Sequence, residues 1–346
     1  MAGLQAQATP SPYVALWSRS DRFAIGDLVA AIEDRSIVKA TLMRSTLHLV
    51  TAADYPAFGV PSAVAGAANW EPTIRRAGVD AAALHAGLLA FAAIPRTVAE
   101  LEAYLDAEVP DDVIADSAPG GVTHVAYRAI SARGGLVHVP PSGVWGASGK
   151  TRLVDARTWL GLDPASVPRF DAALSLVVRR YLAAFGPASM ADIARWAGQR
   201  ALGPLRRVIA GLGDAVRELE GPDGRRLIDL LDLPLSSGDE TAPARFLARW
   251  DSVILGYERR DRILPDAVAP AVVRKANGDV LPTFTVDGWI AGTWSTAADR
   301  TVATIELCPL RTIAGADRRA VADEAERLIR FVGPGAADHR VVWVEP

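Results

Sequence analysis

Two glutamines near the start of the chain are separated by a single residue. Gln5 and Gln7 lie within residues 3–7 (GLQAQ), and Pro10 and Pro12 follow closely, which predicts a loop. On an extended backbone, side chains two positions apart point the same way. A neutral amide can hold a water by hydrogen bonds and face developing positive charge with its carbonyl dipole. A solvated terminal segment would give the same pattern, so an inert loop stays open as the alternative.

A second candidate group follows about forty residues later. Arg44, Thr46 and His48 are spaced so that strand alternation would put all three on one face of a hairpin. Lys39 belongs to the adjoining strand of that hairpin. A cation, a hydroxyl and an imidazole on one face suit contact with phosphate. The exposed polar face of an ordinary hairpin fits the same residues, and the pattern alone does not decide between them.

The elements that must position these residues follow a repeated order of helices and a strand pair. Near residue 200 the order is complete, and a hairpin turn at 221–224 (GPDG) joins its two strands. Ser189 caps the second helix, and Gly198 ends it. The expected helices are 170–184, 190–197 and 204–212, and the expected strands are 216–219 and 226–229. Three helices followed by a hairpin indicate a winged helix-turn-helix.

The same order appears in the middle of the chain, where Thr97 and Glu100 form a predicted capping box. The expected elements there are helices 81–91, one starting after Thr97, and 123–132, then strands 136–139 and 151–155 around a Gly/Ser-rich wing. At the N-terminus only the back half is expected, with helix 25–34 and strands 38–43 and 46–50. We therefore expect the apolar face of this helix, which carries Ile25, Leu28, Val29 and Ile32, to lack part of its partner.

From Ala244 onward the pattern changes to strands and one charged amphipathic helix. The expected strands are 283–287, 289–295, 301–307 and 340–344, and the helix is 317–331. The predicted fold class is α+β, with tandem winged helix-turn-helix units followed by a small C-terminal α/β module. The predicted boundaries are 1–55, 80–160, 165–235 and 244–346. Winged helices favour nucleic acid as the partner, although some serve as protein-interaction modules.

Composition excludes several classes of protein. Half of the 346 residues are apolar and 22% are charged, which excludes wholesale disorder. Cys308 is the single cysteine, so no intramolecular disulfide can form and a reducing cytoplasmic setting is expected. The uncharged run from Ala81 to Pro95 falls short of the roughly 20 apolar residues of a membrane span, and no secretory signal is visible. A net charge of -3 disfavours a protein that coats nucleic acid by charge alone.

No common phosphate-loop, zinc-protease or nucleophile-elbow motif is present in the sequence. The five histidines are scattered, so neither a metal nor another cofactor is expected. We expect a monomer.

Several separated segments, in order, resemble the winged-helix DNA glycosylases of the AlkZ-like and YcaQ-like family. They are residues 3–7 (GLQAQ), 42–50 (LMRSTLHLV), 181–188 (YLAAFGPA), 250–251 (WD), 264–265 (LP) and 286–294 (VDGWIAGTW), together with Arg260 and Arg262. The resemblance covers essentially the whole chain. It implies a metal-free, monofunctional enzyme with Gln5 and Gln7 as the catalytic pair of the Gln-x-Gln branch. It also adds Arg260 and Arg262 to Lys39, Arg44, Thr46 and His48 as DNA-binding residues.

The resemblance implies a DNA repair glycosylase that acts on bulky N-alkylated purines in double-stranded DNA, with interstrand crosslinks as a further candidate substrate. Such lesions are cationic, so the glycosidic bond is primed to break without a general acid. What remains is to orient a water and to stabilise an oxocarbenium-like sugar. The rival prediction is a non-catalytic winged-helix DNA-binding protein or regulator with an inert glutamine loop. Either protein would be cytoplasmic and associated with the nucleoid.

Overall fold

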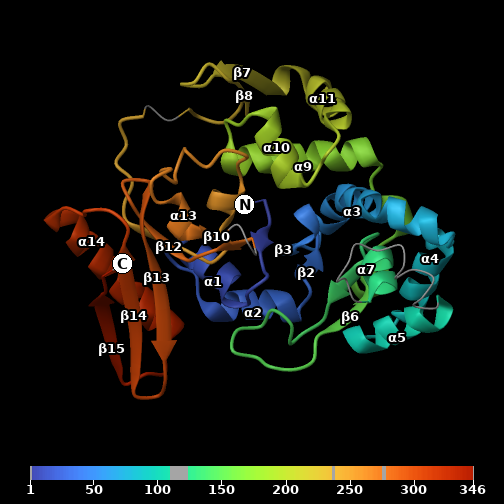
Figure 1. The fold of residues 1–346 in the computed structure, drawn as a ribbon, viewed down its shortest axis with the longest axis horizontal. Helices are drawn as coiled ribbons and strands as arrows, with labels where there is room; N and C mark the ends of the chain where they lie inside the picture. The colour runs from blue at the N-terminus through green and yellow to red at the C-terminus, as the bar shows by residue number, and fades with distance from the viewer. Residues whose placement is uncertain (1, 110–123, 236–237, 275–277, 346) are drawn as a thin grey trace. The chain divides into compact units, whose positions relative to one another are not determined.

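The chain folds into two compact units that exchange a short segment near the N-terminus. In the computed structural model, which describes residues 2–109, 124–235, 238–274 and 278–345, unit 1 comprises Met1–Thr9 and Ile25–Leu233 (Figure 1). Unit 2 comprises Pro10–Ala24 and Pro234–Pro346. Residues 10–24, which the sequence assigned to the first winged helix, therefore belong to unit 2. The three predicted winged helices otherwise share unit 1.

Unit 1 combines an antiparallel sheet, a separate hairpin and the helices packed around them. Its elements are β1 (Leu4–Gln5), α2 (Ile25–Glu33), β2 (Ile37–Thr41), the 3-10 turn η1 (Met43–Ser45), β3 (Leu47–Thr51), α3 (Tyr55–Ala77), α4 (Ala81–Phe91), β4 (Arg96–Thr97), α5 (Val98–Glu108), α7 (Val125–Ser131), β5 (Leu136–His138), β6 (Arg152–Asp155), α8 (Ala156–Leu160), η2 (Pro164–Ser166), α9 (Phe170–Phe185), α10 (Met190–Ala197), α11 (Leu202–Gly211), η3 (Gly213–Ala215), β7 (Val216–Glu220) and β8 (Arg226–Leu230).

The first two predicted winged helices share one sheet instead of forming separate domains. Its strand order is β1-β3-β2-β5-β6-β4. The join is the antiparallel pairing of β2 with β5, in which Lys39 lies opposite His138 and Ala40 opposite Val137. Because β2 of the first predicted unit pairs with β5 of the second, neither strand is an exposed edge strand. The strand carrying the glutamines lies at one end of this shared sheet.

The third winged helix forms as the sequence predicts. Helices α9, α10 and α11 are followed by the β7–β8 hairpin. Ser189 and Asp192 make a reciprocal capping box at the start of α10. Gly198 ends this helix with φ +71°, a left-handed conformation that costs glycine little. The predicted capping box of Thr97 and Glu100 is also present. Thr123, where the third helix of the middle unit was expected to begin, lies outside the described residues, and the described helix is α7.

Helix α3 is the largest element that sequence reasoning missed. It runs over 23 residues, from Tyr55 to Ala77, with Pro61 and Pro72 inside it. Prolines remove helix hydrogen bonds and normally interrupt a helical pattern. Here tertiary packing overrides that signal, because Tyr55, Phe58 and Ile74 are buried. Helices α3 and α9 pack against each other along their lengths.

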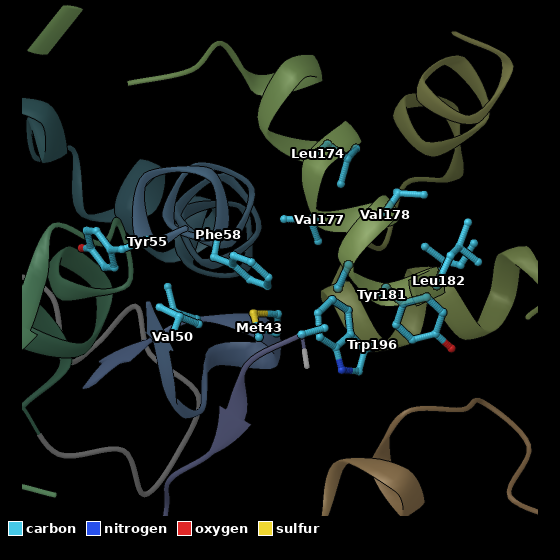
Figure 2. Packing of buried hydrophobic residues seen from close by; sticks show 14 of the residues in the cluster. Met43, Val50, Tyr55, Phe58, Leu174, Val177, Val178, Tyr181, Leu182 and Trp196 are labelled. Carbon is cyan, nitrogen blue, oxygen red and sulfur yellow. The ribbon is translucent and has the colours of Figure 1, made fainter. Parts of the chain in front are cut away.

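The core of unit 1 centres on a cluster of aromatic side chains around Trp196. The Trp196 ring lies 5.1 Å from the ring of Tyr181, 6.1 Å from Phe185 and 6.2 Å from Phe58, measured between centroids. Figure 2 shows Trp196 and Met43 within the same group of side chains. Because these residues come from α3, η1, α9 and α10, the cluster fixes the third winged helix against the glutamine-bearing sheet.

Unit 2 consists of a sheet with an amphipathic helix on it and smaller elements at its edge. Its elements are α1 (Pro10–Trp17), β9 (Arg245–Leu247), α12 (Ser252–Leu255), α13 (Ala269–Val272), β10 (Val273–Arg274), β11 (Asp279–Val280), β12 (Thr283–Val286), β13 (Trp289–Ala298), β14 (Val302–Pro309), α14 (Gly315–Val332) and β15 (Asp338–Trp343). The main strand order is β15-β14-β13-β12-β9, and only β14–β15 is parallel.

Two contacts hold the N-terminal segment 10–24 in unit 2. Arg19 forms a two-point ion pair with Asp251, at 2.6 and 3.1 Å. The Asp251 side chain is fully buried, and its Oδ1 also accepts a hydrogen bond from the backbone N–H of Val253 at the start of α12. The Trp17 ring packs 5.9 Å from Phe331 at the end of α14. A bidentate pair that also caps a helix is a specific anchor.

The prediction that the apolar face of α2 lacks part of its partner is wrong. Leu28 and Ile32 are both buried. The Ile32 side chain reaches the loop between β5 and β6 at Gly143, so the wing of the middle unit covers part of this face. None of the described helices is both long enough and apolar enough to cross a membrane.

We predict that Trp196→Ala strongly destabilises unit 1. Removing a fully buried large aromatic side chain typically costs about 3–5 kcal/mol, and Trp196 is 1% exposed. The free energy of unfolding, measured by chemical denaturation with near-UV circular dichroism, should fall by this amount. Trp289→Ala is the matched control because Trp289 is 44% exposed, and it should change stability by less than about 1 kcal/mol. Equal effects of the two substitutions would contradict the assigned core.

Candidate active site

The first glutamine lies on a strand, and the loop predicted for it is wrong. Strand β1 pairs antiparallel with β3, with Leu4 opposite Leu49 and Gln5 opposite His48. The backbone N–H of Ala6 continues the ladder to the Leu47 carbonyl at 2.8 Å. The free edge of β3 offers hydrogen-bonding groups that the segment would otherwise leave unpaired. That pairing outweighs the loop signal of the following prolines.

Gly3 allows the chain to enter this strand. It has φ +87°, a conformation that residues with a Cβ rarely adopt. A Cβ at this position would also lie 3.2 Å from Cγ1 of Val50 and 3.3 Å from Cε of Met43. The backbone therefore passes close to the core just before the first glutamine. This lack of space explains why the GLQAQ segment begins with a glycine.

The amide groups of both glutamines are oriented by the backbone. Gln5 Oε1 accepts a hydrogen bond from the N–H of Ala6 at 2.9 Å, and Gln7 Oε1 accepts one from the N–H of Leu47 at 3.3 Å. Since a backbone N–H can only donate, the atom facing it in each case is the carbonyl oxygen. Each carbonyl oxygen is therefore held by one backbone N–H. Gln5 is buried and Gln7 is exposed, so the two side chains do not have equal access to a ligand.

His48 lies beside Gln5 as a buried, neutral imidazole. Its Nδ1 is 3.0 Å from the carbonyl oxygen of Thr46. A carbonyl only accepts, so Nδ1 carries the proton and Nε2 is an acceptor. Burial, reinforced by the nearby charge of Arg44, lowers the pKa of His48 to about 3. Nε2 is buried and has no hydrogen-bond partner within the described part of the chain. The imidazole is thus uncharged at neutral pH, and a cationic phosphate contact is not available to it.

Arg44 does not follow the strand alternation predicted for it. Arg44 and Ser45 have φ values of +57° and +56°, so the chain turns sharply between β2 and β3. The guanidinium bends toward α10, where Nη1 donates to the carbonyl oxygen of Trp196 at 2.8 Å. Burial, together with the charge of Arg195, lowers the pKa of Arg44 to about 10, which leaves it charged at pH 7.

The predicted exposed face of Arg44, Thr46 and His48 therefore does not form. The Thr46 hydroxyl donates to the Met43 carbonyl within the turn, at 3.1 Å. Lys39 is also buried, and it lies opposite Leu49, one position away from the partner of His48. Its side chain packs near Gly143, and burial lowers the pKa of the ammonium group. These residues support the glutamine-bearing sheet from within.

The two remaining candidate residues lie in unit 2. Arg260 is partly buried, and its Nε donates to the carbonyl oxygen of Ile254 at 3.2 Å. The guanidinium of Arg262, which is exposed, lies 4.7 Å from the ring centroid of Tyr257. Across the described residues, no group of three or more His, Cys, Asp or Glu side chains is arranged to hold a metal ion.

Comparison with known proteins identifies the class. The sequence profile described as "DNA glycosylase AlkZ-like" matches residues 1–331. The chain belongs to the AlkZ-like DNA glycosylase family, enzymes that hydrolyse N-glycosyl bonds in DNA. It is 26% identical over 324 residues to an interstrand DNA cross-link repair glycosylase of Streptomyces sahachiroi, covering 90% of this chain and 83% of the relative. The solved structure of Streptomyces sahachiroi DNA glycosylase AlkZ matches with a TM-score of 0.79 at 23% identity, over 99% of this chain and 91% of that one.

These matches confirm the α+β fold class, the family resemblance and the assignment as an enzyme acting on DNA. The sequence identified the glutamine pair and His48 by type and order along the chain. It did not predict the hydrogen bonds by which backbone N–H groups hold the side-chain carbonyls of Gln5 and Gln7, because these depend on the β1–β3 register.

We predict that His48 makes unit 1 less stable as the pH falls. Its pKa is about 6.5 when unfolded and about 3 when folded, so below pH 6.5 the unfolded chain binds a proton that the folded chain does not. The stabilising contribution is present above pH 6.5 and is lost progressively toward pH 3. Between pH 7 and pH 5 the loss is about 2 kcal/mol. Denaturation of the parent and of His48→Gln at both pH values measures it.

The His48→Gln variant should lose less stability than the parent over that interval, by about the same 2 kcal/mol. His339→Gln is a matched control in unit 2, and the transition of unit 1 should keep its pH dependence in that variant. An identical pH dependence in the parent and in His48→Gln would show that this imidazole does not titrate as described.

Proposed function

We propose that this enzyme hydrolyses the N-glycosidic bond of bulky N-alkylated purines in double-stranded DNA, and that interstrand crosslinks are among its substrates. The observation that carries the proposal is the pinned glutamine pair beside a neutral histidine. Such a site offers amide hydrogen bonds but no acid or base that titrates near pH 7. A cationic alkylated purine leaves without protonation, so this chemistry suits it, whereas an uncharged normal base would require a general acid.

The two glutamines have different roles in this mechanism. Gln7 is exposed, so its NH₂ group and the second lone pair of its carbonyl oxygen can hold a water or face the sugar. Gln5 is 6% exposed, with its carbonyl bound to the N–H of Ala6. It acts as the support that fixes the strand and the amide environment of Gln7. The water attacks C1′ of the deoxyribose as the bond to the base nitrogen breaks, the electron pair goes to the base, and a water proton is released to solvent.

The relative's name supports the crosslink part of the proposal, since that protein is called an interstrand DNA cross-link repair glycosylase. A Gln-x-Gln pair occurs at residues 5–7 of this chain, with Gln5 on β1 and Gln7 two residues later, just past the end of the strand. The enzyme would act as a monomer in the cytoplasm, on nucleoid DNA.

We predict that Gln7→Ala lowers the single-turnover rate of N7-alkylguanine release more than Gln5→Ala does, with both variants binding duplex nearly as well as the parent. Loss of one positioned group costs up to about 10²–10³-fold in comparable sites, and less is expected here because the leaving group is already activated. If both residues act on one water, the rate loss of the double variant should be smaller than the product of the two single rate losses. Base release from defined alkylated and crosslinked duplexes, with enzyme in excess, measures these rates.

Gln7→Glu tests the role of the amide directly. A carboxylate can stabilise an oxocarbenium and accept a proton, so activity should be retained in part and should fall as the pH drops toward its pKa of about 4.3. Thr41→Ala, an exposed position on β2 of the same sheet, is the matched control and should keep the parent rate. If the double alanine variant still releases the base at the parent rate, the glutamine mechanism is wrong. If the parent releases no alkylated base, the non-catalytic alternative replaces the proposed function.

A further inference from the structure

A polar hollow of about 290 Å³ lies in unit 1 where the β2–β3 turn meets α3 and the end of α10. The side chains that line it carry only positive charge or none. They include Arg44 and Ser45 from the turn, Asn69 from α3, and Arg195 and Arg200 from α10 and the segment after it. All of its lining residues belong to the described part of the chain, and none of them is Asp or Glu. Such a lining selects for an anion.

The two arginines at the hollow are available to a ligand. Arg195 and Arg200 are exposed, and neither makes an ion pair with any described residue. Several other arginines of the winged helices differ: Arg207, for example, is held by Asp171 at 2.9 Å, and Arg217 by Asp229 at 2.7 Å. The guanidinium groups of Arg195 and Arg200 lie at the same hollow as the buried guanidinium of Arg44. Repulsion between these positive charges destabilises the folded chain unless an anion binds among them.

Arg44 adds a buried charge to the same place. Its guanidinium has one bond to a carbonyl, and its Nη2 atom is buried with no partner among the described residues. Arg44 likewise has no carboxylate partner in that part of the chain. A buried cation without a counter-ion is unfavourable, and the neutral His48 beside it gives no compensation. The positive potential of this group therefore adds to that of Arg195 at the hollow.

Two walls of the hollow, the β2–β3 turn and the end of α10, meet at a contact where residue 198 has no room for a side chain. A Cβ on Gly198 would lie 2.8 Å from the backbone nitrogen of Arg44. The turn and the end of α10 thus approach as closely as their backbones allow, and their spacing is fixed before any ligand binds. A preformed site loses little entropy when it is filled.

From this arrangement we propose that the hollow is a phosphate site, in which Arg195 and Arg200, with Ser45 and Asn69, hold one backbone phosphodiester of the DNA. The inference rests on the proposed function in that it takes DNA as the ligand. It adds a specific anchoring point that lies apart from the glutamines, although the β2–β3 turn that forms it continues directly into the strand paired with β1. The site fixes the position of the duplex and does not take part in bond breaking.

The test uses undamaged duplex and the full-length protein, so it does not depend on base release. Asn69→Asp places a carboxylate of the same size at the hollow, and Arg195→Ala with Arg200→Ala removes its two exposed cations. Both variants should bind duplex at least about tenfold more weakly at low salt, and the double alanine variant should lose about one unit of the dependence of log K on log salt concentration. Arg319→Ala, an exposed arginine on α14, is the matched control and should change neither quantity.

Neutral methylphosphonate linkages, placed one at a time along the duplex, identify the phosphate. The parent should lose affinity at one linkage, and that loss should disappear in the double alanine variant because the partner is already gone. Unchanged affinity and salt dependence, or an identical methylphosphonate profile in parent and variant, would overturn the proposal. So would binding of inorganic phosphate that depends on Arg195 and Arg200 without any effect on duplex binding. Failure of base release by the parent would overturn the proposed function while leaving this result intact.

Discussion

The organisation of unit 1 depends on one buried contact between a turn and the end of a helix. The guanidinium of Arg44 reaches the carbonyl of Trp196, and the backbone of Arg44 lies against Gly198. This contact ties the glutamine-bearing sheet to the third winged helix, beside the aromatic cluster of Trp196, Tyr181 and Phe58. A contact that combines a buried charge with a backbone approach permits little rearrangement, because both the hydrogen bond and the spacing would be lost together.

The same contact determines the electrostatics around the glutamines. Burial lowers the pKa of His48 most, and the positive charge of Arg44 acts in the same direction, so the imidazole stays neutral. The strand pair then presents amides and a neutral ring without a carboxylate. Under the proposed function this composition suffices because the substrate brings its own activation. An alkylated purine that already carries positive charge does so, and the enzyme has only to position a water and the duplex.

Local signals in the sequence were sufficient for most individual elements. Helices α9 and α10 were predicted from apolar spacing together with Ser189 and Gly198, and the β7–β8 hairpin from its turn residues. Helix α3 was missed because its prolines are tolerated only in a packed context. The sharing of one sheet by two winged helices was missed because the pairing of β2 with β5 joins segments far apart in the chain.

For the site, residue types were predictable but environments were not. Gln5, Gln7 and His48 were predicted as candidates by type and spacing, and the exposed face expected for Arg44, Thr46 and His48 was wrong, since two left-handed residues at the turn break the alternation. Arg195 and Arg200 carry no sequence signal that separates them from other helix arginines. They are distinguished by lying together at one hollow that has no acidic lining residue, which is a property of three-dimensional neighbours.

Segment 10–24 belongs to unit 2 but lies in the chain between two segments of unit 1. This connection limits how the enzyme can be cut into separate fragments. The glutamine strand belongs to unit 1, but the chain that leaves it enters unit 2 at once and is fastened there by Arg19 and Asp251. No single cut in the chain separates the two units. A fragment ending near residue 233 would keep α1 while losing the aspartate that anchors it, and would expose Trp17 and Phe23, which pack on Phe331 in the whole chain. A domain exchange that keeps the fold of this chain must therefore move both units together or rebuild this crossing.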